Sequence, residues 1–340
     1  MLPRSPARVQ HRDCRKAVFD GLPASMVSMA HPLDTGYFGP DSVSWQVHKE
    51  VTVLFGGARA VLMQAAHPLV IAGARHTGFY ERNPWKRLQR TLLLTYAVTF
   101  GTKTEAKAAA GRINDVHARI HGVDEITGKP YDALEPELLL YVHACLVDCA
   151  LLFESLTVGT LDDAGRQRFH EEQMLAAEMM LIPRSIIPPT VPALRAYLDD
   201  LADAGTFMVT DSAQRVADLF LDPPQDAEWR PVLRGVSRLA FATLPPVMGD
   251  LYGVKVGGIK TTALRATFAS IRATRPFLPP KYRFIAPYNE YRLRARGIEP
   301  PGEVEQARKR AGIRLDITKS IGETSAVSAE DAAAQGTRAQ

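Results

Sequence analysis

Two histidines, His117 and His121, stand four residues apart in this sequence, downstream of the cationic stretch Arg87-Leu88-Gln89-Arg90-Thr91. A neutral imidazole can ligate iron, and guanidinium groups can pair with the two propionates of a haem in a pocket of low dielectric constant. Positive side chains in the first turn of a helix also oppose the helix dipole, which favours a bound anion there. These residue types are compatible with a haem b site with His117 on the iron, although spacing alone favours a structural role for His117; for the arginines, a solvated basic helix start is the alternative.

The spacing of the two histidines is compatible with other roles. Residues four apart on a helix share a face, so His117 and His121 could bind a metal together, as in a metal-dependent hydrolase. A zinc protease of the His-Glu-x-x-His type is disfavoured because Ala118 occupies the position of the general base. Both histidines could instead simply cap a helix end. His67, which precedes Pro68, is the second candidate ligand, although buried histidines at helix ends are more often structural.

The longest apolar stretch, residues 138–156, is predicted to form a buried central helix. It approaches the length of a membrane span, but it contains His143, Asp148 and Glu154, which favours a place in the protein core. A carboxylate buried without a partner costs several kcal/mol. We therefore expect an arginine, a histidine or backbone amides beside Asp148.

The 340-residue chain is 46% hydrophobic and has a formal net charge of +4, so it can bury a large core and is only mildly basic. Its lysines and arginines are scattered among acidic residues, which argues against nucleic-acid binding. Three irregularly spaced cysteines indicate a reducing compartment, and no apolar leader follows the basic N-terminus, so we expect a cytoplasmic location. We expect no transmembrane segment; peripheral membrane contact and a monomer or homodimer are compatible with this composition.

The apolar periodicity predicts helices and no sustained strand, so the expected fold is all-α, a single large helical domain. Residues 1–40 are expected to be an irregular lead-in, 41–315 the helical domain and 316–340 a disordered tail. Gly56-Gly57 is predicted to interrupt the first helix and to permit close helix packing, and His67-Pro68 to end or kink the second. The predicted helices are 45–55, 60–66, 84–99, 104–121, one that opens at Asp132 or Pro136 and closes at Gly159, 160–181, 193–204, 211–221, 229–243 and 259–274.

Five segments follow one another in a characteristic order: Gly56 to Pro68, Arg87 to Thr91, Val116 to Gly122, Tyr141-Val142-His143-Ala144 and the Pro188-Pro189-Thr190 bend. This ordered set resembles the oxygenase family of MpaB and the latex-clearing rubber oxygenases. The likeness covers roughly residues 45–275, and the set is much more specific than any one segment.

The resemblance implies an all-α protein with a globin-like helical core and a haem b held by one histidine. His117 matches the proximal ligand of that family, and Arg87 and Thr91 match an arginine and a threonine that support the haem. In latex-clearing proteins a lysine just before that threonine can occupy the distal iron site. Here the residue is Arg90, which stays protonated and ligates iron poorly, so the distal position should stay open. The likeness around residues 69–86 is too loose to place a catalytic glutamate at Glu81.

By this resemblance we expect a haem-dependent oxygenase or peroxidase that uses O2 or peroxide to oxidise an apolar small molecule, with isoprenoids as candidates, for example by cleaving a C=C bond. Extracellular rubber is disfavoured as the substrate because no export signal is recognised. A haem or lipid binding protein that acts as a sensor or carrier, and a metal-dependent hydrolase built on the two histidines, stay open as alternatives. The candidate catalytic residues are Arg87, Arg90 and Thr91, and the candidate haem-binding residues are His117, Arg87, Thr91, His67 and His121.

Overall fold

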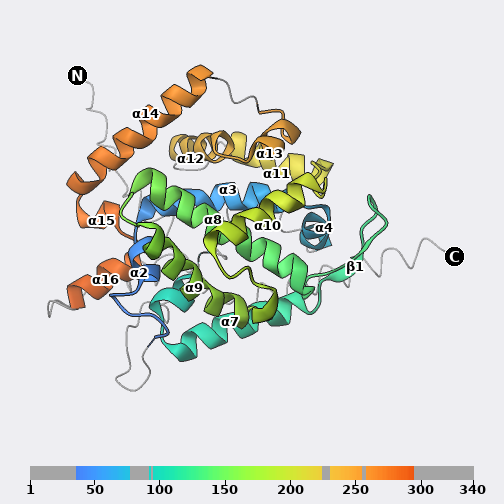
Figure 1. Ribbon diagram of the computed structural model, residues 1–340, viewed down its shortest axis with the longest axis horizontal. Helices are drawn as coiled ribbons and strands as arrows, with labels where there is room; N and C mark the ends of the chain where they lie inside the picture. Colours follow the sequence, from blue (N-terminus) through green and yellow to red (C-terminus); the bar gives the residue numbers. More distant parts are fainter. Residues whose placement is uncertain (1–35, 77–91, 93–94, 224–229, 255–257, 295–340) are drawn as a thin grey trace, which may run out of the picture.

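The computed structural model of the chain describes residues 36–76, 92, 95–223, 230–254 and 258–294. This part is mostly helical, which confirms the predicted all-α fold (Figure 1). The helices are α2 (Val43–His48), η2 (Val51–Leu54), α3 (Phe55–Ala65), α4 (Pro68–His76), α7 (Lys103–His117), α8 (Pro136–Thr157), α9 (Asp163–Met179), η3 (Arg184–Ile186), α10 (Val191–Asp203), α11 (Asp211–Leu221), α12 (Arg230–Ala242), α13 (Pro246–Leu251), α14 (Gly258–Thr274), η4 (Arg275–Phe277), α15 (Pro280–Arg283) and α16 (Ala286–Arg294). Within the described ranges, the strands β1 (His121–Val123) and β2 (Pro130–Asp132) form one antiparallel pair, with Gly122 opposite Tyr131.

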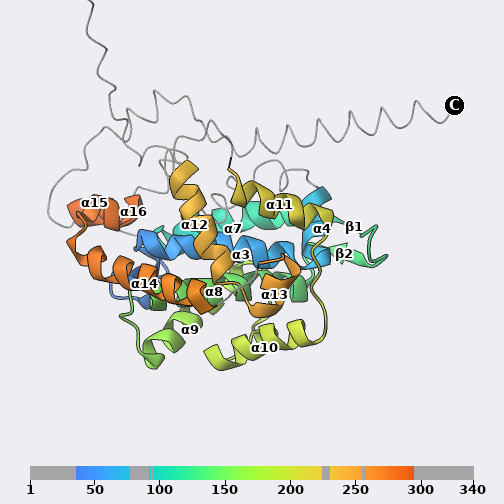
Figure 2. The same ribbon diagram turned by 90° about the horizontal axis from the view of Figure 1, so that it is seen from above.

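The centre of the fold is α8, with α3 packed along it and α9, α10 and α14 around it (Figures 1 and 2). Pro136 occupies the first turn of α8, and Gly159, in the left-handed conformation with φ +68°, follows its end. By length and composition α8 could cross a membrane, but 67% of its most apolar window is buried inside the protein. That burial agrees with the predicted core helix.

Gly56 lies inside α3, so the prediction that the glycine pair interrupts a helix is wrong. The break comes earlier, because Glu50 is extended (φ −83°, ψ 122°) and its carboxylate is bound by Arg275 and Arg283. The expectation of close packing at Gly56 is confirmed. A Cβ there would lie 2.8 Å from the Cys149 carbonyl oxygen and 3.0 Å from the Phe153 ring on α8.

Replacing Gly56 by alanine is therefore expected to destabilise the protein by about 1–3 kcal/mol, because the added methyl group meets the backbone of α8. The matched control is Gly111→Ala, in the exposed middle of α7, where a Cβ meets nothing within 4 Å. That change should stabilise by about 0.5–1 kcal/mol through helix propensity. Urea unfolding of both variants measures the contrast, and equal effects of the two substitutions would contradict the packing.

The predicted kink at His67-Pro68 is confirmed. The segments 51–65 and 68–76 meet at an angle of 99°, and by length and composition together they could form a broken membrane span. Pro68 begins α4, as expected for a residue that has no backbone N–H to donate.

The predicted partner of Asp148 is Arg59 on α3. The Arg59 Nη1 atom donates to Asp148 Oδ2 at 2.7 Å, and its Nε donates to the Thr243 carbonyl at 2.8 Å. Arg59 Nη1 also lies 3.0 Å from Cys149 Sγ, while burial raises the pKa of this thiol to about 11. Arg59 thus joins α3 and α8 to the end of α12.

Candidate functional site

The helix that carries His117 starts from a capping box. The Glu105 backbone N–H donates to Thr102 Oγ1 at 3.1 Å, and the Thr102 N–H donates to the Glu105 carboxylate at 2.9 Å. From this start, Ala106, Ile113 and His117 fall on one face of α7, since residues three and four apart are neighbours on a helix surface.

This face of α7 is covered at one end and partly open at the other. Ala106, Ala109 and Ala110 are buried, whereas Ile113 and His117 are half-buried. The Nδ1 atom of His117 is itself buried. Ile113 and His117 therefore place an apolar side chain and a nitrogen donor together on the partly exposed half of this face.

The predicted helix over 104–121 ends at His117, four residues early. His121 is exposed and belongs to β1, where it pairs with Asp132. The expectation that His117 and His121 share a helix face is therefore wrong. The cause is tertiary: the Ala133 N–H donates to the Ile120 carbonyl at 2.8 Å, so the chain leaves the helix to join the two-stranded sheet.

Two neighbouring helices fix the end of α7. Asn114 Nδ2 donates to the Met179 carbonyl at the end of α9, at 3.0 Å. Ile120 packs on Gly73 of α4, where a Cβ would lie 3.3 Å from the isoleucine side chain. His117 is therefore held on a rigid support, which a ligand of defined geometry requires.

Arg87, Arg90 and Thr91 lie outside the described residues, so their assigned roles stay predictions. The last turns of the helix predicted over 84–99 are described, and residues 95–100 are helical. Tyr96 and Phe100 from these turns share a buried cluster with Ala109 of α7. The end of that helix thus packs against the covered half of the His117 face.

His67 lies in the bend between α3 and α4, 7% exposed, with its ring centroid 5.0 Å from that of Tyr141 and 6.3 Å from that of Phe207. Its Nδ1 atom is buried without a hydrogen-bond partner among the described residues. Burial lowers the pKa of His67 to about 4, so the ring is a neutral imidazole at physiological pH. Its predicted role at the cofactor stays a prediction.

Further buried imidazoles were not assigned from the sequence. The rings of His48 on α2, His143 on α8 and His170 on α9 are all buried, and burial lowers the pKa of His48 to about 4 and that of His143 to about 3. His170 Nε2 lies 2.7 Å from the Pro188 carbonyl oxygen. For His143, the apolar composition of α8 is the sequence feature that indicates burial of the ring.

These buried rings predict acid sensitivity. Because the folded-state pKa of His67 lies near 4 and its ordinary value is 6.5, the unfolded chain binds more protons between these values, and stability is lost as the pH falls from 6.5 towards 4. His67→Phe, which keeps an aromatic ring against Tyr141 and Phe207, should reduce that slope by up to about 1.4 kcal/mol per pH unit. Unfolding curves from pH 8 to pH 4 measure it, and an unchanged slope would contradict the assignment.

The shared helix face on which the hydrolase alternative was based is not present. His117 and His121 lie on different elements, and the described residues contain no group of three or more His, Cys, Asp or Glu side chains that could hold a metal ion.

Residues 45–275 match the family described as "ER-bound oxygenase mpaB/B'/Rubber oxygenase, catalytic domain". The chain belongs to this family. The match covers the same residues, 45–275, that the resemblance predicts. It includes the described elements from α3 to α14, and therefore α7, which carries His117. The chain therefore carries an oxygenase-type domain, which implies O2 and a substrate as its partners.

Two curated relatives are similar over part of the chain. They are uncharacterised proteins of Mycobacterium bovis and Mycobacterium tuberculosis, each 25% identical over 192 residues, which is 55% of this chain and 68% of each relative. No solved structure gives a significant match.

Proposed function

We propose that this protein is a haem b-dependent oxygenase that uses O2 or peroxide to oxidise an apolar small molecule, with isoprenoids as the class to test first. The observation that carries the proposal is the position of His117, at the half-open end of an apolar helix face within an oxygenase-family domain. A cytoplasmic location is part of the proposal.

His117 would hold the iron through its imidazole, Arg87 would pair with a propionate, and Thr91 would donate a hydrogen bond at the haem edge. When bound, the haem supplies an iron that can activate O2 or peroxide for oxidation of a C=C bond. The roles of Arg87 and Thr91 come from the family resemblance.

The chain itself would hold the iron ligand in place and offer apolar contact to the cofactor. Asn114 and Ile120 fix the end of α7, so that the imidazole is held before the cofactor arrives. Ile113, on the same face as His117, would offer apolar contact to the bound haem. By the family resemblance, Arg90 would stand where latex-clearing proteins have a lysine, and as a protonated guanidinium it would ligate iron poorly.

Haem titration into the purified apoprotein tests the binding step, and a saturable Soret band at one haem per chain is the expected result. O2 uptake with a panel of isoprenoid olefins, followed by mass spectrometry for carbonyl fragments, tests the chemistry. A chain that stays colourless with haem supplied would overturn the proposal. Haem binding without any product from the panel would instead favour a haem carrier or sensor.

A further inference from the structure

The segment from α14 to α16 is strongly basic. Residues 258–294 contain eight lysines and arginines and one glutamate, whereas the whole chain contains 41 basic and 37 acidic residues. The scattered distribution expected from the whole sequence does not hold here. In both views α14, α15 and α16 lie along one edge of the molecule, and the β1–β2 pair lies at the opposite edge (Figures 1 and 2).

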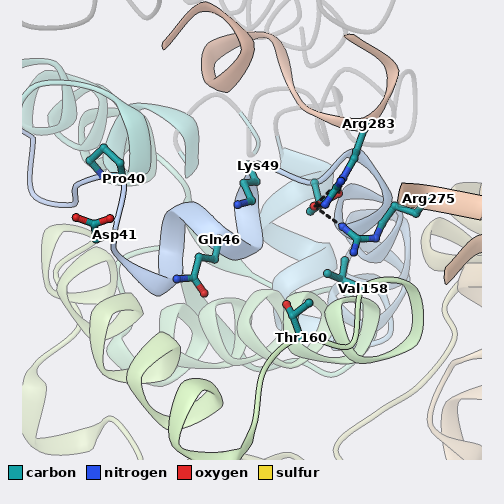
Figure 3. Close-up of a pocket in the computed structure, with 9 residues that line it drawn as sticks. Pro40, Asp41, Gln46, Lys49, Val158, Thr160, Arg275 and Arg283 are labelled. Carbon is teal, nitrogen blue, oxygen red and sulfur yellow. Dashed lines mark hydrogen bonds and ion pairs between the residues drawn. The ribbon is translucent and has the colours of Figure 1, made fainter. Parts of the chain in front are cut away.

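A cavity of about 450 Å³ lies where this segment meets α2 (Figure 3). Lys49, Arg275 and Arg283 line it, together with Glu50 and Thr160. Among the described residues, its lining includes neither His117 nor any other residue of α7.

Positive charge is in excess in this cavity. The buried Glu50 carboxylate accepts from Arg275 Nη1 at 2.6 Å and from Arg283 Nη2 at 3.0 Å, so one carboxylate serves two guanidinium groups. Asp41 at the cavity is exposed. Arg275 is 8% exposed, and its Nε atom has no hydrogen-bond partner among the described residues.

Lys49 adds a third cation. Its Nζ lies 5.2 Å from the ring centroid of Tyr288 and 5.8 Å from that of Phe284. Burial lowers the pKa of Lys49 and the nearby arginines lower it further, against the opposing effect of Glu50. An added anion would relieve this repulsion, and a phosphoryl group offers several strong acceptor oxygens to guanidinium and ammonium donors.

An exposed apolar tip, within residues 277–282, connects Arg275 to Arg283 in the chain, and both of these arginines line the cavity. Phe277 is 87% exposed, and Leu278 and Tyr282 are 40% and 46% exposed. Phe277 and Leu278 stand between Pro276 and the Pro279-Pro280 pair, which restrict the backbone and lower the entropy cost of holding the tip in one conformation. A large aromatic ring on a stiff tip beside cations is suited to insertion at a lipid interface.

We propose that the edge formed by α14, α15 and α16 docks on an anionic phospholipid membrane, with a lipid phosphate in the cavity of Lys49, Arg275 and Arg283 and Phe277 among the upper acyl chains. Juxtamembrane cations are each worth about a fivefold gain in binding to an anionic surface, and a buried phenylalanine ring is worth about tenfold or more. A groove for nucleic acid would follow an extended backbone with stacked aromatic rings, whereas here the cations line a single, partly open cavity of about 450 Å³.

Co-sedimentation of the full chain with vesicles tests this proposal. We expect binding to phosphatidylcholine vesicles that contain phosphatidylglycerol, weaker binding without it, and weakening by added salt. Phe277→Ser should reduce the partition coefficient about tenfold and Lys49→Met about fivefold. The matched controls are Ile126→Ser, an exposed apolar residue between β1 and β2, and Lys107→Met, an exposed lysine of α7, and both should bind like the wild type.

Three results would overturn the proposal: no vesicle binding by the wild type, equal losses in the test and control variants, or preferential binding of a nucleic-acid probe. Glycerol 1-phosphate tests whether the cavity binds the phosphate of a soluble molecule or that of a lipid. Competition at millimolar concentration would support the cavity as the phosphate site. Tight binding of glycerol 1-phosphate without vesicle binding would assign the cavity to a soluble ligand and reject the membrane.

Discussion

The His117→Gly variant is expected to lose the Soret band that the wild type shows with added haem, and oxygen uptake should fall to background with it. His117 is the histidine on the half-open face of α7, and glycine removes the proximal nitrogen while leaving space for a small ligand. A haem without its protein ligand keeps only apolar contacts and propionate pairing, so its affinity should fall at least tenfold. Titration followed by visible absorption measures the loss.

Added imidazole should restore the Soret band of His117→Gly, since the free base can occupy the space of the missing side chain. This rescue separates ligation from misfolding. His121→Gly is the matched control, because that side chain is exposed on β1 and should leave the spectrum unchanged. Loss of the band in His121→Gly with retention in His117→Gly would reverse the assignment.

The sequence predicts best those elements whose ends are set locally. The predicted helix 211–221 matches α11 at both ends, and α9 begins three residues after the predicted start at 160, with Asp162 as its cap, where the Gly165 N–H donates to the aspartate at 2.7 Å. In both cases the side chains that start the helix lie within its first turn. The apolar pattern and the capping side chains therefore place these helix ends alike, and no contact with a distant residue is needed to set them.

Elements set by distant partners were placed wrongly or missed. The helix predicted to continue to 55 stops at His48, because Glu50 binds Arg275, 225 residues away. The apolar pattern of Val116 and Ile120 continues past the true end of α7, which depends on pairing with Ala133. Local periodicity carries no information about either contact.

In the candidate site, too, the sequence predicts what local spacing sets and misses what distant contacts set. Spacing alone can place Ile113 and His117 on one face, but it cannot show that this face is covered at one end and open at the other. Nor could it place His121 away from His117, because a helix that continued for one more turn would bring them together. The basic cavity has no local signature either, since Lys49 and Arg283 are far apart in the chain.

Glu50→Gln is expected to destabilise the fold by about 3–5 kcal/mol, because it leaves two guanidinium groups at a buried site without a counter-charge. The Glu50 side chain is 2% exposed, and its partners Arg275 and Arg283 are 9% and 25% exposed. Glutamine keeps the size of the side chain and one acceptor oxygen, so the loss reports the charge. Chemical denaturation at neutral pH measures it.

Asp222→Asn tests whether burial, and not the number of partners, sets this cost. Asp222 also binds two arginines, Arg230 and Arg234, each at 2.6 Å, but its side chain is 66% exposed. Water and salt screen such a pair, so the unfolding midpoint should not change measurably.

Because the Glu50 contacts hold η4 and α15 against α2, hydrogen exchange in Glu50→Gln should rise first at the Ile285 amide, which donates to the Lys49 carbonyl at 2.9 Å. A uniform rise across α8 and α15 would mean instead that the ion pair stabilises the whole core and not this one attachment.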